Sequence, residues 1–432
     1  MFSKNNHLLS VLEISLYFLP ASFLLGTLIV NLNLIIFIFL ATTYLILNKI
    51  KIILNISNLT LFTFFLVLIL SSYKNINQIG IENFLKSIFL LKFYLLYILI
   101  ETLLFQRKLN IKYFFNVCLV LSVLLSLDLV LQFFYGKNIL GYEPWEGRIT
   151  GIFRDEAIAG SYIQKVFVFS LISLFSIFYP SRKYKTLIVI AALSLIVFGS
   201  YIASNRISFL ILISFMLIVT LLIKELRKNL ILVILILLPI FYHFYQNDLQ
   251  TNQKYKGFFS MTKSIMINLE NKLRHYEQNN QNFLKKENTS LKKNRMTTHE
   301  KLFLTSFQSF KENIFLGSGH KSFRFKCQIF VKKKDSFACS THPHNYHLEI
   351  LHDTGIIGLI FLSLFVFSLL YKATKKLTSK ELNYNEKIIL ALLIINFLFI
   401  IFPLKSTGSL FTTWNGALLW LSVSLINYGN QK

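Results

Sequence analysis

Residues 340–358, STHPHNYHLEILHDTGIIG, gather four histidines in a chain that is otherwise mostly apolar: His342, His344, His347 and His352. A neutral imidazole can accept a proton from a hydroxyl group, and several imidazoles together can bind a metal ion. Histidines also suit a membrane interface through their amphipathic character alone. The segment therefore predicts proton transfer, metal binding or a purely interfacial role.

The first residues of this segment are typical of a helix start. Thr341 can cap free N–H groups and Pro343 is tolerated in a first turn, so we expect a membrane helix to begin near His344. A helix N-terminus disfavours a charged imidazolium, which predicts a neutral ring at His344. His344 is the candidate general base, and Asn345 and Glu349 are the neighbours expected to orient it.

A metal site would need three or four of these side chains to converge. On a continuous helix, His342, His344, His347 and Glu349 spread around the axis instead. No second cluster of carboxylates or thiolates completes a ligand set. We therefore predict no metal here.

The elements that must position these residues are membrane helices. Hydrophobic residues make up 54% of the chain, with 44 Phe, which excludes an ordinary soluble domain of this length. We expect an all-α polytopic membrane protein with about twelve spans, each about 17–25 residues long. The predicted spans are 8–26, 28–47, 54–72, 86–105, 113–135, 160–179, 186–202, 206–223, 229–245, 348–371, 386–404 and 408–427.

Loop charge orients the spans. With a cytoplasmic N-terminus, the inside segments carry 18 Lys and Arg and the short outside loops carry seven. The positive-inside rule favours this topology, which places the long loop 246–347 outside. The chain then divides into helices 1–5 (1–135), helices 6–9 with an outside loop (136–245), the large loop (246–347) and helices 10–12 (348–432).

The large outside loop is basic, with 18 Lys and Arg against seven Asp and Glu. Such an excess suits an anionic ligand or surface, and membrane lipids fit better than nucleic acid. Residues 298–316 have apolar side chains near helical spacing and predict an amphipathic helix on the membrane surface or over the helix bundle. Cys327 and Cys339 are expected to pair in an oxidising compartment and to stiffen the approach to His344.

The histidine segment resembles a known family. His344 and Asn345, followed after nine residues by GIIG from Gly355 to Gly358, are similar to the pattern of the bacterial O-antigen ligases. The related O-antigen polymerases share a looser form. GSGHKSF, with Gly317 and Gly319, is similar to the family's Gly-x-Gly turn.

Four arginines extend the resemblance. Arg206 looks like the family's membrane-edge arginine, and Arg295 like its loop arginine. RITGIFRDEAIAGSYI, with Arg148 and Arg154, looks like the family's upstream outside loop. The resemblance covers about 150–360.

The family transfers a glycan from undecaprenyl diphosphate to a hydroxyl on the periplasmic face of the bacterial inner membrane, on a fold like the GT-C glycosyltransferases. A ligase uses lipid A-core as acceptor, and a polymerase uses another lipid-linked repeat unit. The resemblance implies His344 as the base and no metal or other cofactor. The leaving diphosphate must then be neutralised by arginines, for which Arg206, Arg295, Arg154 and Arg148 are the candidates.

Three alternatives stay open. The intact spacing favours the ligase slightly over the polymerase. A transporter or flippase of the same lipid-linked glycan would need polar residues along a path through the bilayer, whereas 208–223 and 229–241 are almost uninterrupted apolar sequence. A non-catalytic scaffold would leave the combination of His344, Arg206 and Arg295 unexplained.

Overall fold

The computed structural model describes residues 2–178, 183–203, 205–248, 252, 255–256, 297–332, 336–403 and 405–427. Within these ranges the chain forms α-helices and one short 3-10 helix, η1 (Gly151–Phe153), and no strand. The all-α class is thus confirmed for the described residues. The candidate residue Arg295 and the rest of 257–296 lie outside them.

In the described part of the chain, nine apolar helices are long enough to cross a membrane, as expected of a polytopic membrane protein. Eight of them are α1 (Phe2–Leu25), α2 (Thr27–Leu47), α3 (Ile56–Lys74), α6 (Ile111–Tyr135), α7 (Ala159–Phe178), α10 (Lys224–Asn247), α14 (Tyr346–Thr378) and α15 (Tyr384–Ile401). The ninth joins α4 (Ile76–Phe89) and α5 (Leu91–Phe105).

Three further predicted spans fall on helices with shorter apolar stretches. They are α8 (Lys183–Ile202), α9 (Arg206–Leu222) and α16 (Thr413–Ile426). The count of twelve crossings therefore stays a prediction. Two more helices, α12 (Thr298–Phe310) and α13 (Phe323–Val331), precede α14.

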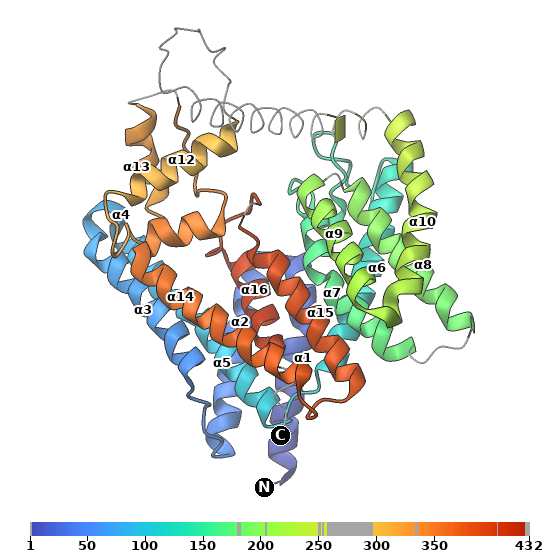
Figure 1. The fold of residues 1–432 in the computed structure, drawn as a ribbon, viewed down its shortest axis with the longest axis horizontal. Helices are drawn as coiled ribbons and strands as arrows, with labels where there is room; N and C mark the ends of the chain where they lie inside the picture. Colours follow the sequence, from blue (N-terminus) through green and yellow to red (C-terminus); the bar gives the residue numbers. More distant parts are fainter. Residues whose placement is uncertain are drawn as a thin grey trace, which may run out of the picture.

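The helices α12 and α13 lie at the end of the molecule opposite to the beginning of α1 (Figure 1). We call this the α12/α13 end. The predicted amphipathic helix at 298–316 is present as α12 but ends at Phe310. Its buried residues are Leu302, Thr305, Ser306 and Ser309, and Ser306 Oγ donates to Leu348 O of α14 at 3.3 Å.

Helix α14 packs lengthwise on α3. Ser57 Oγ and Ser368 Oγ lie 2.6 Å apart, and Ser71 Oγ donates to Asp353 O at 2.8 Å. Short side chains allow the two backbones to approach closely, which is a common way for helices to associate in lipid. This contact fixes the position of the segment that carries the histidines.

The tenth span was expected as one continuous helix, which is wrong. Helix α14 breaks at Gly355, whose φ of 64° and ψ of −166° are not helical. A Cβ at Gly355 would lie 2.2 Å from Phe315 O, so only glycine fits there. In Figure 1 the part of α14 before the break runs across the bundle and the longer part runs down it.

A turn at 313–319 joins the two parts of α14. Ser318 N and Gly319 N donate to the carbonyls of His352 and Asp353, at the end of the first part, at 2.8 and 3.0 Å. The first N–H groups of the second part, at 356 and 357, donate to the carbonyls of 314 and 315 at 2.8 and 3.2 Å. The turn thus supplies partners that a broken helix would otherwise lack.

The other motif glycines are also explained by close approach. Gly317 and Gly319 have φ of 72° and 87°, and a Cβ at either would come within 3 Å of neighbouring backbone. A Cβ at Gly358 would lie 2.1 Å from Thr354 Oγ1. Gly317 thus packs against the break in α14, and Gly319 packs against α3.

Candidate active site

His344 lies just outside helix α14, which corrects the expected helix start. The helix begins at Tyr346, and Asn345 is its cap, with a side-chain oxygen that accepts from Leu348 N at 3.1 Å. His344 has a left-handed backbone, with φ of 59°. Thr341 does not cap the helix, because the Asn345 side chain already does so.

A loop between α15 and α16, residues 402–412, is bonded to the beginning of α14. Thr407 N donates to His344 O at 2.8 Å. Asn345 Nδ2 donates to Pro403 O at 2.6 Å and to Lys405 O at 3.3 Å. Asn345 therefore has two structural tasks: it caps α14 and it holds this loop beside His344.

Two more side chains of the histidine segment hold the same connection. His347 Nε2 lies 2.7 Å from Ile401 O. The buried carboxylate of Glu349 accepts hydrogen bonds from Ser409 Oγ and from Leu410 N, the latter at 2.7 Å. Asn345 and Glu349 thus act on the site through the loop; the ring of His344 is bonded elsewhere.

The ring of His344 lies among other polar rings. Its Nε2 is 3.2 Å from Ser340 Oγ, and its centroid is 4.1 Å from that of His342 and 5.4 Å from that of His299 on α12. Burial lowers the pKa of His344 below its ordinary value, and His299 lowers it further, while a contact with the Thr407 backbone opposes the shift. The ring is therefore neutral at pH 7 and can accept a proton.

His344 opens onto a cavity of about 560 Å³. The cavity is lined by residues at the beginning of α7 and of α9, by Tyr346, and by the segment 405–415. Two of its lining residues are lysines, Lys165 from α7 and Lys405 from the 402–412 loop. It thus combines a neutral imidazole with cationic side chains, which suits a reaction on an anionic substrate.

The predicted arginines that the structure describes differ in whether they adjoin this cavity. Arg206 is the first residue of α9, and both of its chain neighbours, Asn205 and Ile207, line the cavity. Arg206 therefore lies at the rim. Electrostatic contact also links it to Tyr255.

Arg154 and Arg148 lie on the loop before α7 and are exposed. The Arg154 guanidinium donates to the Tyr142 hydroxyl and stacks 4.5 Å from the centre of that ring. Arg148 exchanges backbone hydrogen bonds with Trp145. Glu156, further along this loop, lines the cavity, but the two arginines do not.

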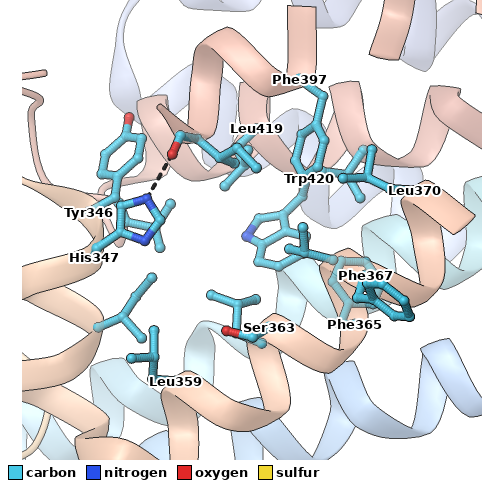
Figure 2. A pocket seen from close by; sticks show the side chains of 16 residues that line it. Tyr346, His347, Leu359, Ser363, Phe365, Phe367, Leu370, Phe397, Leu419 and Trp420 are labelled. Carbon is cyan, nitrogen blue, oxygen red and sulfur yellow. Dashed lines mark hydrogen bonds between the residues drawn. The ribbon is translucent and has the colours of Figure 1, made fainter. Parts of the chain in front are cut away.

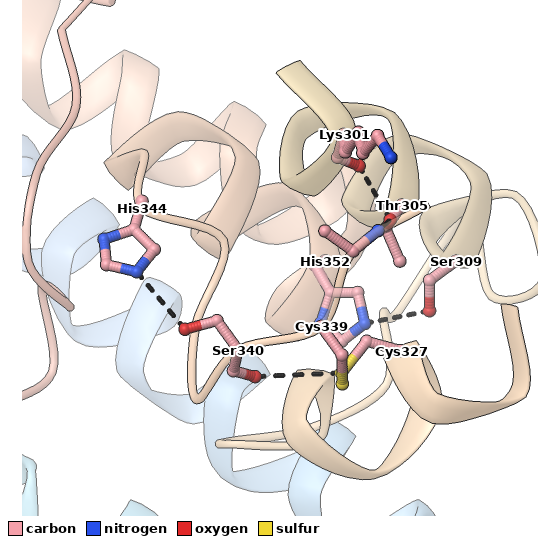
Figure 3. The surroundings of a disulfide bond; sticks show 9 residues. Lys301, Thr305, Ser309, Cys327, Cys339, Ser340, His344 and His352 are labelled. Carbon is pink, nitrogen blue, oxygen red and sulfur yellow. Dashed lines mark hydrogen bonds between the residues drawn. A yellow bond between two sulfur atoms is a disulfide. The ribbon is translucent and has the colours of Figure 1, made fainter. Parts of the chain in front are cut away.

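The cysteines expected to pair do so in the structure (Figure 3). The Cα atoms of Cys327 and Cys339 are 5.0 Å apart. Ser340, the next residue, has its carbonyl oxygen 3.7 Å from Cys327 Sγ and contacts His344 through its hydroxyl. The disulfide thus fixes the residue that touches the candidate base.

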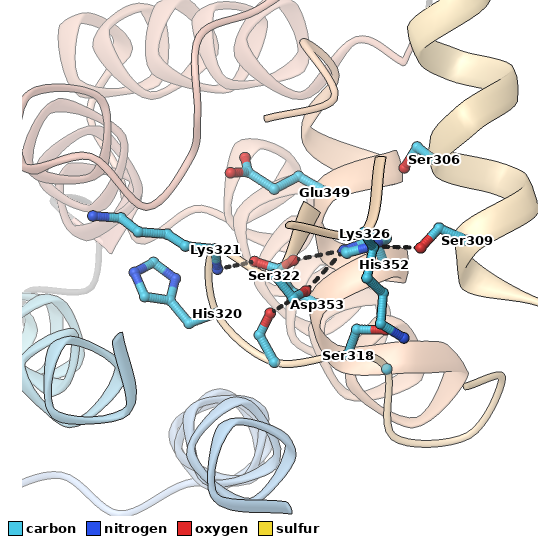
Figure 4. Close-up of polar contacts among 12 residues, drawn as sticks. Ser306, Ser309, Ser318, His320, Lys321, Ser322, Lys326, Glu349, His352 and Asp353 are labelled. Atoms are coloured by element: carbon cyan, nitrogen blue, oxygen red, sulfur yellow. Dashed lines mark hydrogen bonds and ion pairs between the residues drawn. The ribbon is translucent and has the colours of Figure 1, made fainter. Parts of the chain in front are cut away.

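His352 has a different environment from His344, although both belong to the same segment. It is fully buried, with Nε2 3.0 Å from Ser309 Oγ and Nδ1 2.9 Å from Asp353 Oδ1 (Figure 4). Asp353 Oδ2 accepts in turn from Lys321 N at 3.2 Å. This network joins α12, α14 and the glycine turn and is structural.

A second, apolar cavity of about 280 Å³ lies between α14, α15 and α16 (Figure 2). Tyr346 and His347 line one side of it, and Phe365 and Trp420 line another. Tyr346 also lines the His344 cavity. The polar and apolar cavities therefore meet at this residue.

Among the residues that the structure describes, no three His, Cys, Asp or Glu side chains are placed to hold a metal ion. Around the His344 ring, the His342 ring is tilted by 42° and the His299 ring is edge-on.

The sequence interpretation missed the role of the 402–412 loop and of the two lysines. One signal was present, because Lys165 stands inside a predicted span, where a charged residue is costly unless it serves a ligand or pathway. Lys405 gave no such signal, since it lies in a short loop whose contact with His344 is purely tertiary.

Comparison with known families gives one match. Residues 159–363 match the family model described as O-antigen ligase. This range includes α7 with Lys165, Arg206 at the start of α9, His344, and α14 through its break. No curated protein matches the chain.

Proposed function

We propose that this chain, whose residues 159–363 match the family model described as O-antigen ligase, transfers a glycan from undecaprenyl diphosphate to a hydroxyl of lipid A-core. The enzyme is a multi-pass protein of the bacterial inner membrane with a GT-C-like arrangement of about twelve spans. Its large loop and the α12/α13 end face the periplasm, as loop charge favours. The reaction needs no metal and no other cofactor.

The observation that carries this proposal is the position of His344. A neutral imidazole lies at a cavity that two lysines also line. A donor with a diphosphate needs positive charge for its leaving group, and an acceptor hydroxyl needs a proton acceptor. The cavity offers both.

The reaction is a single displacement. The acceptor oxygen attacks the anomeric carbon as His344 takes the hydroxyl proton. The bond between that carbon and the phosphate oxygen breaks, and its electron pair leaves with undecaprenyl diphosphate. The anomeric configuration is inverted.

Arginines stabilise the charge that grows on the departing diphosphate. Arg206 is the first candidate, because it lies at the rim of the cavity. Arg154 and Arg148, on the loop before α7, and Arg295, outside the described residues, are further candidates. A planar guanidinium bonds two phosphate oxygens at once, so we expect Arg206→Lys to impair transfer even though it keeps the charge.

The decisive test supplies the purified protein with a lipid-linked repeat unit, with and without lipid A-core. We expect one product, formed only when core is present, in which the glycan is joined to the core. A ladder of longer lipid-linked glycans without core would contradict the ligase assignment and identify a polymerase. No product in either arm, from protein that folds and binds the donor, would contradict both.

A further inference from the structure

Two lysines of the His344 cavity are held by neutral groups. The Lys165 ammonium donates to Asn415 Oδ1 and lies 4.4 Å from the centre of the Trp414 ring. Lys405 Nζ donates to Phe399 O at 2.6 Å. The lysines come from α7 and from the loop before α16, and both line the cavity.

Neither lysine has a carboxylate partner among the described residues. The ion pairs found there involve other side chains, and the one carboxylate that lines the cavity belongs to Glu156. Because both lysines line the same cavity, their like charges oppose each other when both are protonated. Burial lowers the pKa of Lys405 to about 8, which reflects the cost of keeping a charge there without a partner.

Lys326 is a buried lysine that, unlike Lys165 and Lys405, has a carboxylate partner among the residues that the structure describes. Its side chain is 9% exposed and its Nζ lies 3.3 Å from Glu312 Oε2. Breaking even a weak pair of this kind leaves a costly buried charge. Lys165 and Lys405 lack such a partner, so their charges destabilise the empty cavity unless an anion enters it.

The loop geometry supports this explanation. Lys405 is held at the cavity because Asn345 bonds its carbonyl and because Glu349 fixes residues 409 and 410. Lys165 is held by the Trp414 and Asn415 side chains at the start of α16. Several neutral contacts thus aim two cations into a single space beside the candidate base.

We propose that Lys165 and Lys405 form an anion site that binds the phosphate groups of the lipid-linked donor inside the His344 cavity. This inference rests on the proposed function and adds the residues that bind the diphosphate within the cavity. Arg206 then acts at the rim of the cavity, and the other candidate arginines act outside the cavity. Two cations from separate elements suit a diphosphate, because each can bond a different phosphate group.

Binding to the full-length protein in nanodiscs tests the site, with undecaprenyl diphosphate and uncharged undecaprenol as probes. We expect Lys165→Met and Lys405→Met each to weaken diphosphate binding by about ten-fold or more, since hydrogen bonds to charged groups contribute about 1.5–3 kcal/mol. Undecaprenol binding should not change. A double variant that binds undecaprenyl diphosphate within about two-fold of wild type, a difference well under one such bond, would overturn the proposal.

Lys372→Met is the matched control. Lys372 is also partly buried and bonded to neutral groups, Asn55 Oδ1 and Ser57 Oγ, but it lies in the last turns of α14, far along the helix from His344. We expect it to bind undecaprenyl diphosphate as wild type does. Equal losses in Lys372→Met and in the cavity variants would show a general charge effect and overturn the proposal.

Thermal unfolding without lipid separates a ligand site from a structural role. Removal of an unpaired buried charge should leave the melting temperature unchanged or raise it, and Lys405→Arg should retain most diphosphate binding. Met variants that lose binding only because they unfold at lower temperature would contradict the proposal.

Parallel assays keep the two proposals apart. Wild type that binds undecaprenyl diphosphate through these lysines but transfers no glycan would contradict the proposed function and support the anion site. Unchanged donor binding and transfer in the double variant would contradict the anion site but not the proposed function. Lysine variants that lose affinity for phosphorylated lipid A-core while donor binding is unchanged would also overturn the donor assignment.

Discussion

Two connecting segments form hydrogen bonds with the first part of α14. They differ in whether they leave open space beside the helix. The turn at 313–319 and the residues that follow it to Ser322 meet the helix through backbone hydrogen bonds and tightly packed glycines. The buried His352 of the helix is bonded to Ser322 and to its neighbour Asp353. The loop at 402–412 meets the same helix through Asn345 and Glu349 but borders a cavity.

The difference separates stability from chemistry within a single segment. On the turn side, the buried His352 and Asp353 find partners inside the protein, and substitutions should change folding. On the loop side, a neutral histidine and two lysines face open space, and substitutions should change activity or binding. The following predictions sharpen or break this contrast.

The largest effect is expected on the turn side. Gly355→Ala would force a side chain into a left-handed backbone and against Phe315 O, and we expect a loss of about 3 kcal/mol or more of folding stability. Thermal unfolding and the yield of monodisperse protein measure it.

Gly136→Ala is the control for that substitution. Gly136 also has a left-handed φ, of 76°, but a Cβ there would meet nothing within 4 Å. It should cost about 1 kcal/mol. If Gly355→Ala were as mild as Gly136→Ala, the close packing at the α14 break would be wrong.

The next effect concerns the disulfide. Opening the Cys327–Cys339 ring, whose cysteines are twelve apart in sequence, should cost about 3 kcal/mol in the chain-entropy model. Cys339→Ser should lower the unfolding temperature, and a reductant should lower that of wild type but not of the variant. If wild type unfolds at the same temperature with and without reductant, a structural disulfide is contradicted.

Asn345 separates helix capping from the loop contact. Asn345→Ala loses both, with a cap contribution of about 1 kcal/mol. Asn345→Asp keeps a capping oxygen but cannot donate to Pro403 O. We expect the Asp variant to unfold closer to wild type than the Ala variant while glycan transfer falls in both; full transfer by Asn345→Asp would show that the loop contact does not support the site.

The smallest effect is a shift in pH dependence. His344 works as a base only when neutral, so activity should be lost as pH falls through its pKa, which burial and His299 hold below the ordinary histidine value. His299→Gln removes one of those causes and should move the acidic limb of the pH–rate profile to higher pH. His243→Gln, on α10, is the control, and an unmoved limb in His299→Gln would contradict the contact.

The sequence predicts the helices well and the site in part. Among the described residues, apolar runs locate the nine helices long enough to cross a membrane, because about 30 Å of hydrocarbon imposes its length on the sequence. The spacing around His344 singles out the residue that borders the cavity. It could not predict the buried environment of His352, since the partners of His352 on α12 and on the glycine turn are distant in sequence.

The rest depends on tertiary contacts that leave no local pattern. The break at Gly355 sits in an apolar run that reads as continuous helix, and only the approach of Phe315 and Gly317 explains it. Asn345 looks like a partner of the neighbouring histidine, yet its amide bonds a loop about 60 residues later in the chain.

The most direct test of the central claim is a single-turnover measurement of glycan transfer by purified His344→Ala. The account predicts a fall of about 100-fold or more, because general-base catalysis contributes about 10²–10⁴. Folding and undecaprenyl diphosphate binding should remain at wild-type levels. Transfer within a few-fold of wild type would contradict the assignment of His344 as the base.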